Sequence, residues 1–398
     1  MNTTLVKRLH LSLILLILGF AAQAFLAGSV LAQNTIATGS IQGIILDSSG
    51  GVVPSAQVTI KNKDTGQSFN VPTSSAGAFT SGAIVPGNYS VRVEAQGFKT
   101  IEKDVIVKVG ETENANITLT VGSSSTVVEV QAEAVTVNTE QASVQGVLGK
   151  EQIENLPVNG RNFLDLAQLE PGVQVQDGAD FDPTKVGFSS ISFGGRFGRT
   201  ARISVDGVDV SDETVGTTTE NIPASAIQEF NLSQSSLDLS NELTSSGAVN
   251  VITRSGTNDF HGEGFALFRS SDFSAALPSP PGTALQSPFE RNQDGGNFGG
   301  PIMKDKLFFF LDAEHINQGL TAPVVTSDPF TALSGNTSAP FRETDYNARL
   351  DWIVSKNVHL FYRFTYFDKA WASVLLNQMS TSRLNWASHG TLAATLRP

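Results

Sequence analysis

The residue types that most often carry out chemistry in proteins are scarce in this sequence and far apart. The 398 residues include no cysteine. The histidines are His10, His261, His315, His359 and His389. None of them recurs at the spacing that metal ligands use. The glycine-rich stretches GGRFGR and GGNFGG lack the Gly-Lys-Ser/Thr ending of a phosphate loop, and the serine-rich tracts have no partnered base. We therefore predict no enzyme activity, no metal and no cofactor.

The elements that could position other functional residues are clearest at residues 344–367. One side of an alternating pattern holds Tyr346, Ala348, Leu350, Trp352 and Val354, then Val358, Leu360, Tyr362, Phe364 and Tyr366. The other side holds Asp345, Asn347, Arg349 and Asp351, then His359, Arg363 and Thr365. Period two predicts two strands, joined by a turn at Ser355-Lys356-Asn357. Runs of about ten residues suit tilted strands in a bilayer, although a solvated hairpin would show the same alternation.

The neighbouring segments favour a membrane barrel. Strands are expected at 259–268, 293–302, 306–316, 344–354, 357–367 and 388–396. Their connections alternate between long (269–292, 317–343, 368–387) and short (around 304–305 and 355–357), as the outer loops and periplasmic turns of an outer-membrane barrel do. Of the 30 aromatic residues after residue 32, 20 lie in the last 141 residues. We predict that residues 258–398 begin a transmembrane antiparallel barrel that contacts outer-membrane lipid.

The amino terminus predicts export from the cytoplasm. Lys7 and Arg8 precede an apolar run from Leu11 to Phe20, and small residues lead to Ala32. This pattern predicts a signal peptide over residues 1–32 that is removed after Ala32.

Residues 33–120 predict a small β-sandwich. Short apolar runs alternate with turn signals such as Asp64-Thr65-Gly66 and Pro86-Gly87-Asn88. The segments GSIQGIILDSSGGVVPSAQVTIKN and AGAFTSGAIVPGNYSVRVEAQGF resemble the carboxypeptidase regulatory-like family, a transthyretin-like sandwich that is not catalytic. Its fold is grouped with carbohydrate-binding sandwiches, but the aromatics Tyr89 and Phe98 are expected in the core.

Residues 121–135 predict a linker, GSSST, followed by an extended stretch, Val127, Val128, Glu129 and Val130, with no evident partner strand. Such a stretch can add to the edge of another protein's sheet. VVEVQAEA resembles the TonB box, which energised outer-membrane receptors offer to the periplasmic domain of TonB. The alternative is the first strand of the following domain.

Residues 136–257 predict a mixed α/β domain within the most acidic part of the chain, which disfavours a nucleic-acid partner. Helical spacing from Phe163 to Leu169 ends at Pro171-Gly172, and strands are expected at 202–206, 228–232 and 247–253. LPVNGRNFLDLAQLEPGV, ISFGGRFGRTARISVDGVDV and SSGAVNVITRSGTNDFHGEGFALFR resemble the plug and plug-to-barrel passage of TonB-dependent receptors, above all the Oar-like subgroup. NFGGPIMKDKLFFFLDAEH resembles the family's early barrel hairpin.

The resemblance implies an outer-membrane receptor that binds an oligosaccharide, peptide or chelate at its outer loops and moves it through a plugged barrel. TonB would supply the energy, and the barrel assembly machinery would insert the protein. Polar contacts suit a movable plug, and Arg196, Arg199, Asp206 and Asp209 are the expected contacts between plug and barrel.

The sequence departs from the family in one respect. It predicts about six strands where relatives use about 22, and it ends Leu396-Arg397-Pro398 instead of with an aromatic-ended strand. We expect an N-terminal part of a longer protein. Two alternatives remain open: a barrel for surface adhesion or protein export, and a periplasmic carbohydrate-binding protein.

Overall fold

The computed structural model describes most of the sandwich, of the mixed α/β domain and of the predicted barrel segment. The described residues are 37–122, 127–130, 145–156, 162–178, 188–196, 198–212, 214, 216–234, 246–273, 289–319, 321–324, 328–329, 331, 335–356, 358–375 and 378–396. The predicted signal peptide lies outside them. So do residues 123–126 and 131–135 of the predicted linker, which include the end of the TonB-box-like stretch.

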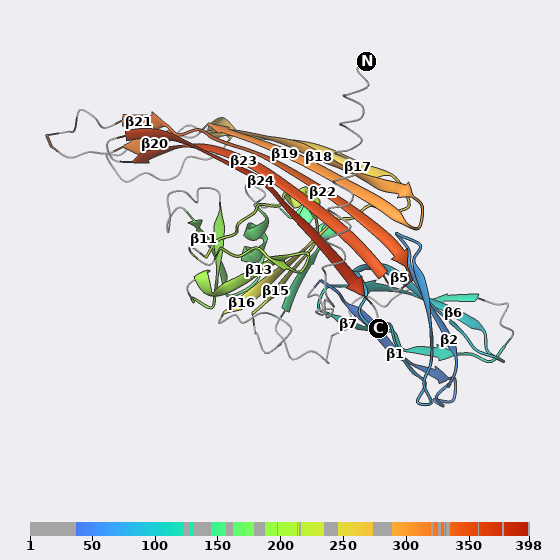
Figure 1. Cartoon of the computed structure of the whole chain (residues 1–398). Helices are drawn as coiled ribbons and strands as arrows, with labels where there is room; N and C mark the ends of the chain where they lie inside the picture. Colours follow the sequence, from blue (N-terminus) through green and yellow to red (C-terminus); the bar gives the residue numbers. More distant parts are fainter. Residues whose placement is uncertain are drawn as a thin grey trace, which may run out of the picture. The chain divides into compact units, whose positions relative to one another are not determined.

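The first domain is a β-sandwich of two sheets, shown in blue and cyan in Figure 1. Its strands are β1 (Ser40–Asp47), β2 (Gln57–Asn62), β3 (Ser68–Pro72), β4 (Ala78–Thr80), β5 (Gly87–Glu94), β6 (Thr100–Val107), β7 (Thr112–Asn114) and β8 (Ile117–Leu119). In one sheet β1 lies between β4 and β7 and also pairs with β8, while the other runs β3-β2-β5-β6. Alternate residues of β2 and β5 fill the core, and Tyr89 is buried there as expected.

The turn signals of the sandwich fall where the backbone needs them. Gly50, Gly66, Gly77 and Gly97 all have positive φ, a conformation that glycine adopts without steric cost. The sequence did not predict β6, because its residues TIEKDVIV do not alternate cleanly. Its neighbours in the sheet decide its conformation.

The segment Val127–Val130 forms a strand, β9, that has a partner within the chain. It pairs in parallel with β6 and extends the second sheet to β3-β2-β5-β6-β9. The expectation of no partner strand was therefore wrong. It failed because β6 itself had not been recognised, so the edge that receives β9 was missing from the sequence prediction.

Residues 145–253 form a second domain, which we call the central module. Its sheet has the order β10-β15-β16-β13-β14. These strands are β10 (Gln145–Gly149), β13 (Ala201–Val205), β14 (Val208–Asp209), β15 (Ile227–Ser233) and β16 (Gly247–Thr253), and a hairpin of β11 (Val173–Asp177) and β12 (Ser189–Phe193) accompanies them. The helical elements are α2 (Lys150–Asn155), η1 (Phe163–Leu169), η3 (Gly198–Thr200) and η4 (Ala224–Ala226). Strands β13, β15 and β16 and the helical segment therefore fall where the sequence predicts them, although the helix is of the 3-10 type. Strands β10, β11, β12 and β14 and helix α2 were not predicted.

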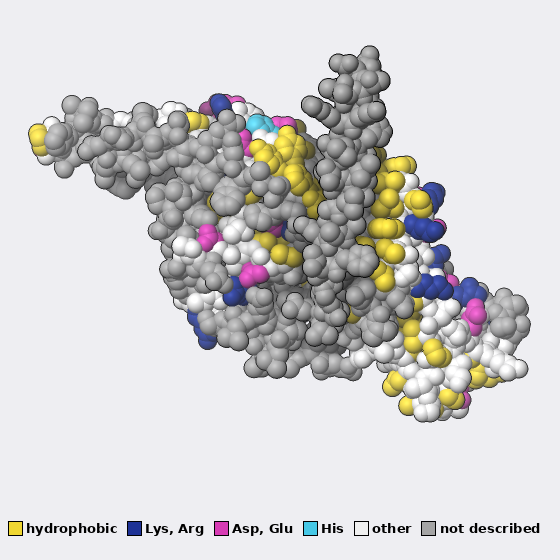
Figure 2. Space-filling view, in the orientation of Figure 1, with side chains coloured by type: hydrophobic (Ala, Val, Ile, Leu, Met, Phe, Trp, Pro, Cys, Tyr) yellow, Lys and Arg dark blue, Asp and Glu magenta, His cyan; other side chains and the backbone are white. Residues whose placement is uncertain are grey.

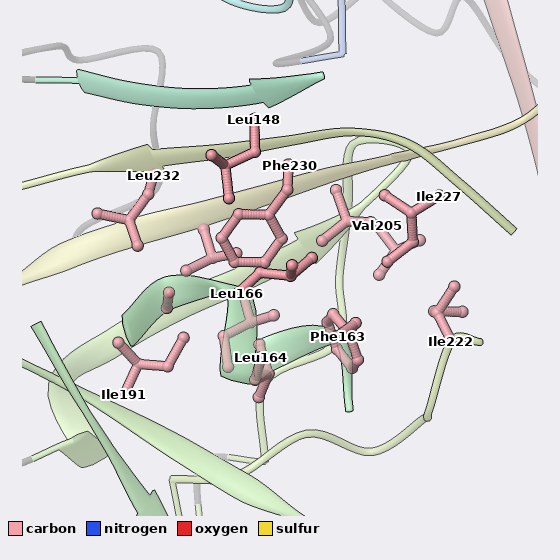
Figure 3. Packing of buried hydrophobic residues seen from close by; sticks show 14 of the residues in the cluster. Leu148, Phe163, Leu164, Leu166, Ile191, Val205, Ile222, Ile227, Phe230 and Leu232 are labelled. Atoms are coloured by element: carbon pink, nitrogen blue, oxygen red, sulfur yellow. The ribbon is translucent and has the colours of Figure 1, made fainter. Parts of the chain in front are cut away.

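An apolar cluster holds the central module together. Figure 3 shows Phe163, Leu164 and Leu166 of η1 pointing toward Phe230 and Leu148 of the sheet. Asn162 begins η1 by accepting a hydrogen bond from the Leu164 N–H, which satisfies a backbone donor at the helix start. The cluster buries these side chains almost completely, and all but one of its residues belong to the module, the exception being Phe310 of the last domain.

The last domain is a six-stranded antiparallel sheet, which we call the large sheet, drawn in yellow to red in Figure 1. In order its strands are β17 (His261–Ser270), β18 (Glu290–Met303), β19 (Leu307–Gly319), β22 (Phe341–Ser355), β23 (Val358–Leu375) and β24 (Gln378–Leu396). Each pairs with the next along the chain. All six predicted strands are present, and each is at least as long as expected. The six described strands form an open sheet, not a closed barrel.

The connections agree with the predicted alternation at four of the five positions. A small hairpin of β20 (Thr321–Val324) and β21 (Gly335–Ser338) occupies the second long connection, and η5 (Ser271–Phe273) begins the first. The fifth was wrong: β23 and β24 continue their pairing to Leu375 and Gln378, so the expected loop at 368–387 is mostly strand. The prediction assumed strands no longer than a bilayer is thick, whereas the backbone pairing continues beyond that length.

Candidate functional site

The two faces of the large sheet differ sharply in chemistry. On one face Leu311, Leu350, Trp352 and Tyr362 are exposed, and on the space-filling surface hydrophobic side chains gather over this sheet (Figure 2). On the other face most buried side chains are polar: Gln293, Asn297, Asp312, Glu314, Glu343, Asp345, Asn347, Arg349, Asp351, Arg363, Thr365 and Lys369. Five buried apolar residues share this face: Phe308, Phe310, Ile316, Phe361 and Phe367. The strict alternation of strands separates the two sets, as in a sheet with lipid on one side and a polar lumen on the other.

The polar face places two arginines side by side. Arg349 of β22 and Arg363 of β23 are register partners, and both are almost completely buried. Like charges at paired positions destabilise a sheet unless anions lie between them. The central module supplies two of those anions, Asp206 and Glu220, and the resulting contact is the candidate functional site, which we call the ionic seam.

Asp206 of the central module bridges the two arginines. Its Oδ1 lies 3.0 Å from Arg349 Nη1, and its Oδ2 lies 3.0 Å from Arg363 Nε. The Thr253 backbone N–H donates to Asp206 Oδ1 at 2.9 Å, and the Thr253 hydroxyl donates to Oδ2 at 2.7 Å. Both carboxylate oxygens are therefore bonded from two sides.

A tight turn presents Asp206 to the sheet. Asp206 and Gly207 join β13 to β14 and have φ angles of 51° and 81°. Positive φ at both central residues is the signature of the two-residue hairpin turn that Asp-Gly sequences favour. The buried aspartate is thus held at a turn whose backbone conformation the sequence specifies.

Glu220 makes the second contact of the seam. Arg363 donates from Nη1 to Glu220 Oε2 at 3.1 Å and from Nη2 to Oε1 at 2.8 Å. This is the bidentate geometry in which a guanidinium binds a carboxylate most strongly. Arg363 Nη1 also donates to the Thr365 hydroxyl at 2.7 Å, so its orientation is fixed from its own strand.

Asp351 neutralises Arg349 from within the sheet. Arg349 Nε lies 2.9 Å from Asp351 Oδ2, and His359 Nε2 lies 3.2 Å from Asp351 Oδ1. The Arg349 guanidinium also lies over the ring of Phe361, 4.6 Å from its centroid. Arg349 therefore stays compensated in part even where Asp206 moves away.

A second group of polar contacts lies further along the same strands. Lys369 Nζ is 2.9 Å from Glu343 Oε1, which also accepts a hydrogen bond from the Asn221 amide at 2.7 Å. The Lys369 ammonium lies 3.9 Å from the centroid of the Phe188 ring. Asn221 and Phe188 belong to the central module, so this group also joins the module to the large sheet.

Ion pairs and hydrogen bonds make up much of this interface, beside two apolar contacts. Phe310 of β19 packs into the module's apolar cluster, and the rings of Phe188 and Phe367 meet edge to face with their centroids 5.8 Å apart. Bringing ions out of water offsets much of their attraction, so a buried ion pair adds little net stability. Removing a single partner is costly, because the other charge stays buried without compensation. An interface of this kind is specific in register, yet water can replace its bonds once the surfaces part.

The central module also contacts the sandwich at one buried point. The Val109 N–H donates to Glu229 Oε1 at 2.7 Å, and the Asn231 amide donates to the Val109 carbonyl at 3.0 Å. Burial raises the pKa of Glu229 to about 7, although the hydrogen bond from Val109 opposes this rise. The contact therefore holds a carboxyl group that titrates near neutral pH.

The residues predicted as contacts between plug and barrel have different positions. Asp206 lies in the seam. Asp209 is instead 2.9 Å from Arg202 Nη1 in its own hairpin, and Arg196 is exposed on the turn after β12. The side chain of Arg199 lies outside the described residues. Only one of the four is thus described in contact with the large sheet.

Most members of the seam were not singled out from the sequence. The alternation did assign Arg349, Asp351 and Arg363 to the polar face, so their burial could have been predicted if that face were taken as covered. Glu220 carried no signal, because it lies in a threonine-rich loop, TTTENIP, without periodicity. Its partner is 143 residues away along the chain.

Among the described residues, no group of three or more acidic or histidine side chains could hold a metal ion. No helix of the described part of the chain has the length and apolar character to cross a membrane.

Comparisons with known proteins identify the class. The model of the carboxypeptidase regulatory-like domain matches residues 40–120, and the model of an outer membrane beta barrel domain matches residues 252–339. The chain is therefore an outer-membrane protein that joins a regulatory-like sandwich to part of a β-barrel.

One curated relative is similar to more than half of the chain. The chain is 26% identical over 254 residues to the TonB-dependent transporter Oar of Myxococcus xanthus, a match that covers 60% of this chain and 23% of the relative. It is thus a homologue of Oar and spans less than a quarter of that protein's length.

Solved structures resemble the chain over part of its length. The siderophore receptor PirA of Acinetobacter baumannii is 21% identical with a TM-score of 0.42, covering 57% of this chain and 32% of the receptor. The outer membrane transporter YddB of Escherichia coli is 14% identical with a TM-score of 0.46, covering 57% and 33%.

Proposed function

We propose that the chain is the plug-bearing part of a TonB-dependent outer-membrane transporter, in which the central module is the plug and the large sheet is part of the barrel wall. Substrate would bind at the outer loops and pass along the polar face when the plug moves. TonB would provide the work by pulling on the segment Val127–Val130. The homology to a TonB-dependent transporter supports this function.

The ionic seam is the observation that carries the proposal. A plug must fill a lumen tightly and must also leave the wall. Asp206 and Glu220 contact the wall through charges, whereas the module's apolar side chains pack mainly against one another, with Phe310 as the one residue of the wall in their cluster. The module therefore has a cohesive interior and a contact surface that water can solvate, which is what displacement as a unit requires.

Val128→Pro tests the coupling to TonB. A proline removes a backbone donor from the extended segment and prevents strand addition at that position. We expect crosslinking to the periplasmic domain of TonB to be lost, and TonB-dependent uptake with it. Membrane insertion, measured by resistance to alkaline carbonate extraction, should not change. Unchanged crosslinking would contradict the proposed role of this segment.

Arg196 provides a test of the plug's exposed turn. Charge reversal, Arg196→Glu, is expected to change plug retention or uptake if this turn contacts parts of the wall beyond the described strands. The matched control is Arg92→Glu on the sandwich, an exposed arginine with no proposed role. Uptake and retention that are unaffected in both variants would remove Arg196 from the site.

A further inference from the structure

The parallel pairing of β9 with β6 gives the sandwich a role in energy coupling. The register joins Thr100 to Val127 and continues to Lys103 and Val130, so β9 covers the outer edge of β6. An uncovered strand edge is a template for another strand. We propose that the β6 edge is a docking site for this chain's own TonB-box-like segment, and that the docked segment is withheld from TonB until it is released. This rests on the proposed function.

The chain holds the segment close to its docking site. Val121 forms a bridge with Phe98, and the Gly122 N–H donates to the Gly97 carbonyl at 3.1 Å. Only residues 123–126 separate this anchor from β9. A short tether gives an effective concentration in the millimolar range. TonB would therefore compete with an intramolecular partner and would bind the segment more weakly than it binds a free peptide of the same sequence.

The pairing is short enough to be reversible. Four register pairs hold β9 in place, and the third brings two acidic residues, Glu102 and Glu129, to the same position of neighbouring strands. Like charges at paired positions weaken a sheet. This mismatch makes the release of β9 easier. In a strand with a purely structural role, an opposite charge at this position would make the pairing more stable.

The contact of the sandwich with the central module adds a consequence. Val109, just after β6, is held by Glu229 and Asn231 of β15. The edge that holds the segment is therefore anchored to the module that TonB would displace. Release of β9 would have to precede any pull on the module, because a docked segment passes the force to the sandwich first.

A disulfide across the two strands tests the docking. The chain has no cysteine, so Glu102→Cys with Glu129→Cys creates the only pair. The control is Arg92→Cys with Glu129→Cys, because Arg92 is the register partner of Glu102 on β5. Its position is two strand spacings from Glu129, about 9–10 Å, and so beyond the roughly 7 Å that a disulfide can bridge. We expect the first pair, and not the second, to oxidise in the full chain.

TonB binding then tests the withholding. The purified periplasmic domain of TonB serves as the probe, with the double-cysteine chain oxidised or reduced. We expect the oxidised form to bind at least tenfold more weakly than the reduced form, and reduction to restore the binding of the Glu129→Cys single variant. Equal binding in both states would overturn the proposal, since the sandwich would then present the segment. Failure of the first pair to oxidise above the control would overturn the docking itself.

A charge change adds a second measurement that needs no disulfide. Glu102→Lys replaces the like-charge pair by an opposite-charge pair, and we expect TonB to bind about threefold more weakly. Glu94→Lys, the same change on β5, should leave TonB binding unaltered. Stronger binding by the Glu102→Lys chain would contradict the proposal. Absence of TonB binding by the unaltered chain and by a free Val127–Val130 peptide would instead refute the proposed function, and this inference with it.

Discussion

The interior of the central module and its surface against the large sheet are built by opposite means. Inside, Phe163, Leu164 and Phe230 exclude water and pack through apolar contacts (Figure 3). At the seam, Asp206 and Glu220 are just as deeply buried, but they contact arginines of the wall. Both regions are buried. When their contacts separate, water can solvate the charges of the seam but cannot replace the apolar contacts of the interior.

This difference indicates which contact can separate while the module stays folded. A body with an apolar interior and an ionic surface separates at the surface, since exposing charges to water recovers the desolvation cost that burial imposed. The contact between the module and the sandwich is neither apolar nor ionic in this sense. It consists of two hydrogen bonds around Val109, one of them to a titratable carboxyl group. The variants below distinguish these three regions.

Arg363→Ala should have the largest effect at the seam. It leaves Asp206 and Glu220 buried beside a wall that has lost its bidentate donor, and breaking such a pair costs about 3–5 kcal/mol. We expect the central module to become accessible to protease from the wall side while its own fold persists. Limited proteolysis would measure the accessibility of the module, and urea unfolding would show whether its own fold persists. A fully protected module would contradict the importance of the seam.

Phe230→Ala should give a comparable loss of stability in a different place. Truncating a buried phenylalanine costs about 3–5 kcal/mol through lost contacts and the cavity left behind. We expect cleavage within the module, at β15 and β10, and loss of its cooperative unfolding. If Arg363→Ala and Phe230→Ala give the same cleavage pattern, the interior and the seam do not differ as described.

Glu229 predicts a pH dependence of the contact between sandwich and module. Its pKa is raised to about 7 from the usual 4.5. The folded state therefore binds the proton more tightly than the unfolded state does. The contribution of protonated Glu229 to the free energy of unfolding is thus complete below about pH 4.5 and is lost as the pH rises through 7. It is at most on the order of 3 kcal/mol. Glu229→Gln, which keeps an acceptor for the Val109 N–H, should flatten the difference in unfolding free energy between pH 5 and pH 8. An unchanged pH dependence would contradict the assignment to Glu229.

The pair of Arg202 and Asp209 should have the smallest effect. Its two side chains are about one-third exposed, so Asp209→Asn should change the unfolding free energy by less than about 1 kcal/mol. Urea unfolding beside Arg363→Ala gives the comparison directly. A loss as large as that of Arg363→Ala would show that this pair contacts the wall after all.

The sequence could predict the features that are set by residues close together in the chain. Alternation in β22 and β23 predicted both strands and both faces, and the spacing from Phe163 to Leu169 predicted the helical segment. The turn at Asp206-Gly207 was not predicted, although Asp-Gly is a sequence that favours it. Contacts between distant segments could not be predicted, because nothing near Glu220 indicates Arg363 and nothing near Val127 indicates Thr100. The long extension of β23 and β24 also escaped, because backbone pairing between neighbours continues where side-chain alternation no longer shows it.

A double-mutant cycle at Glu220 and Arg363 tests the central claim most directly. Urea unfolding of the full chain would be measured for Glu220→Gln, Arg363→Gln and the double variant. The seam predicts that the double variant loses at least about 1.5 kcal/mol less than the two single losses together, the coupling found for close buried charge pairs. Additive losses would show that the two residues do not interact, and the central module would then not be held to the wall by these charges.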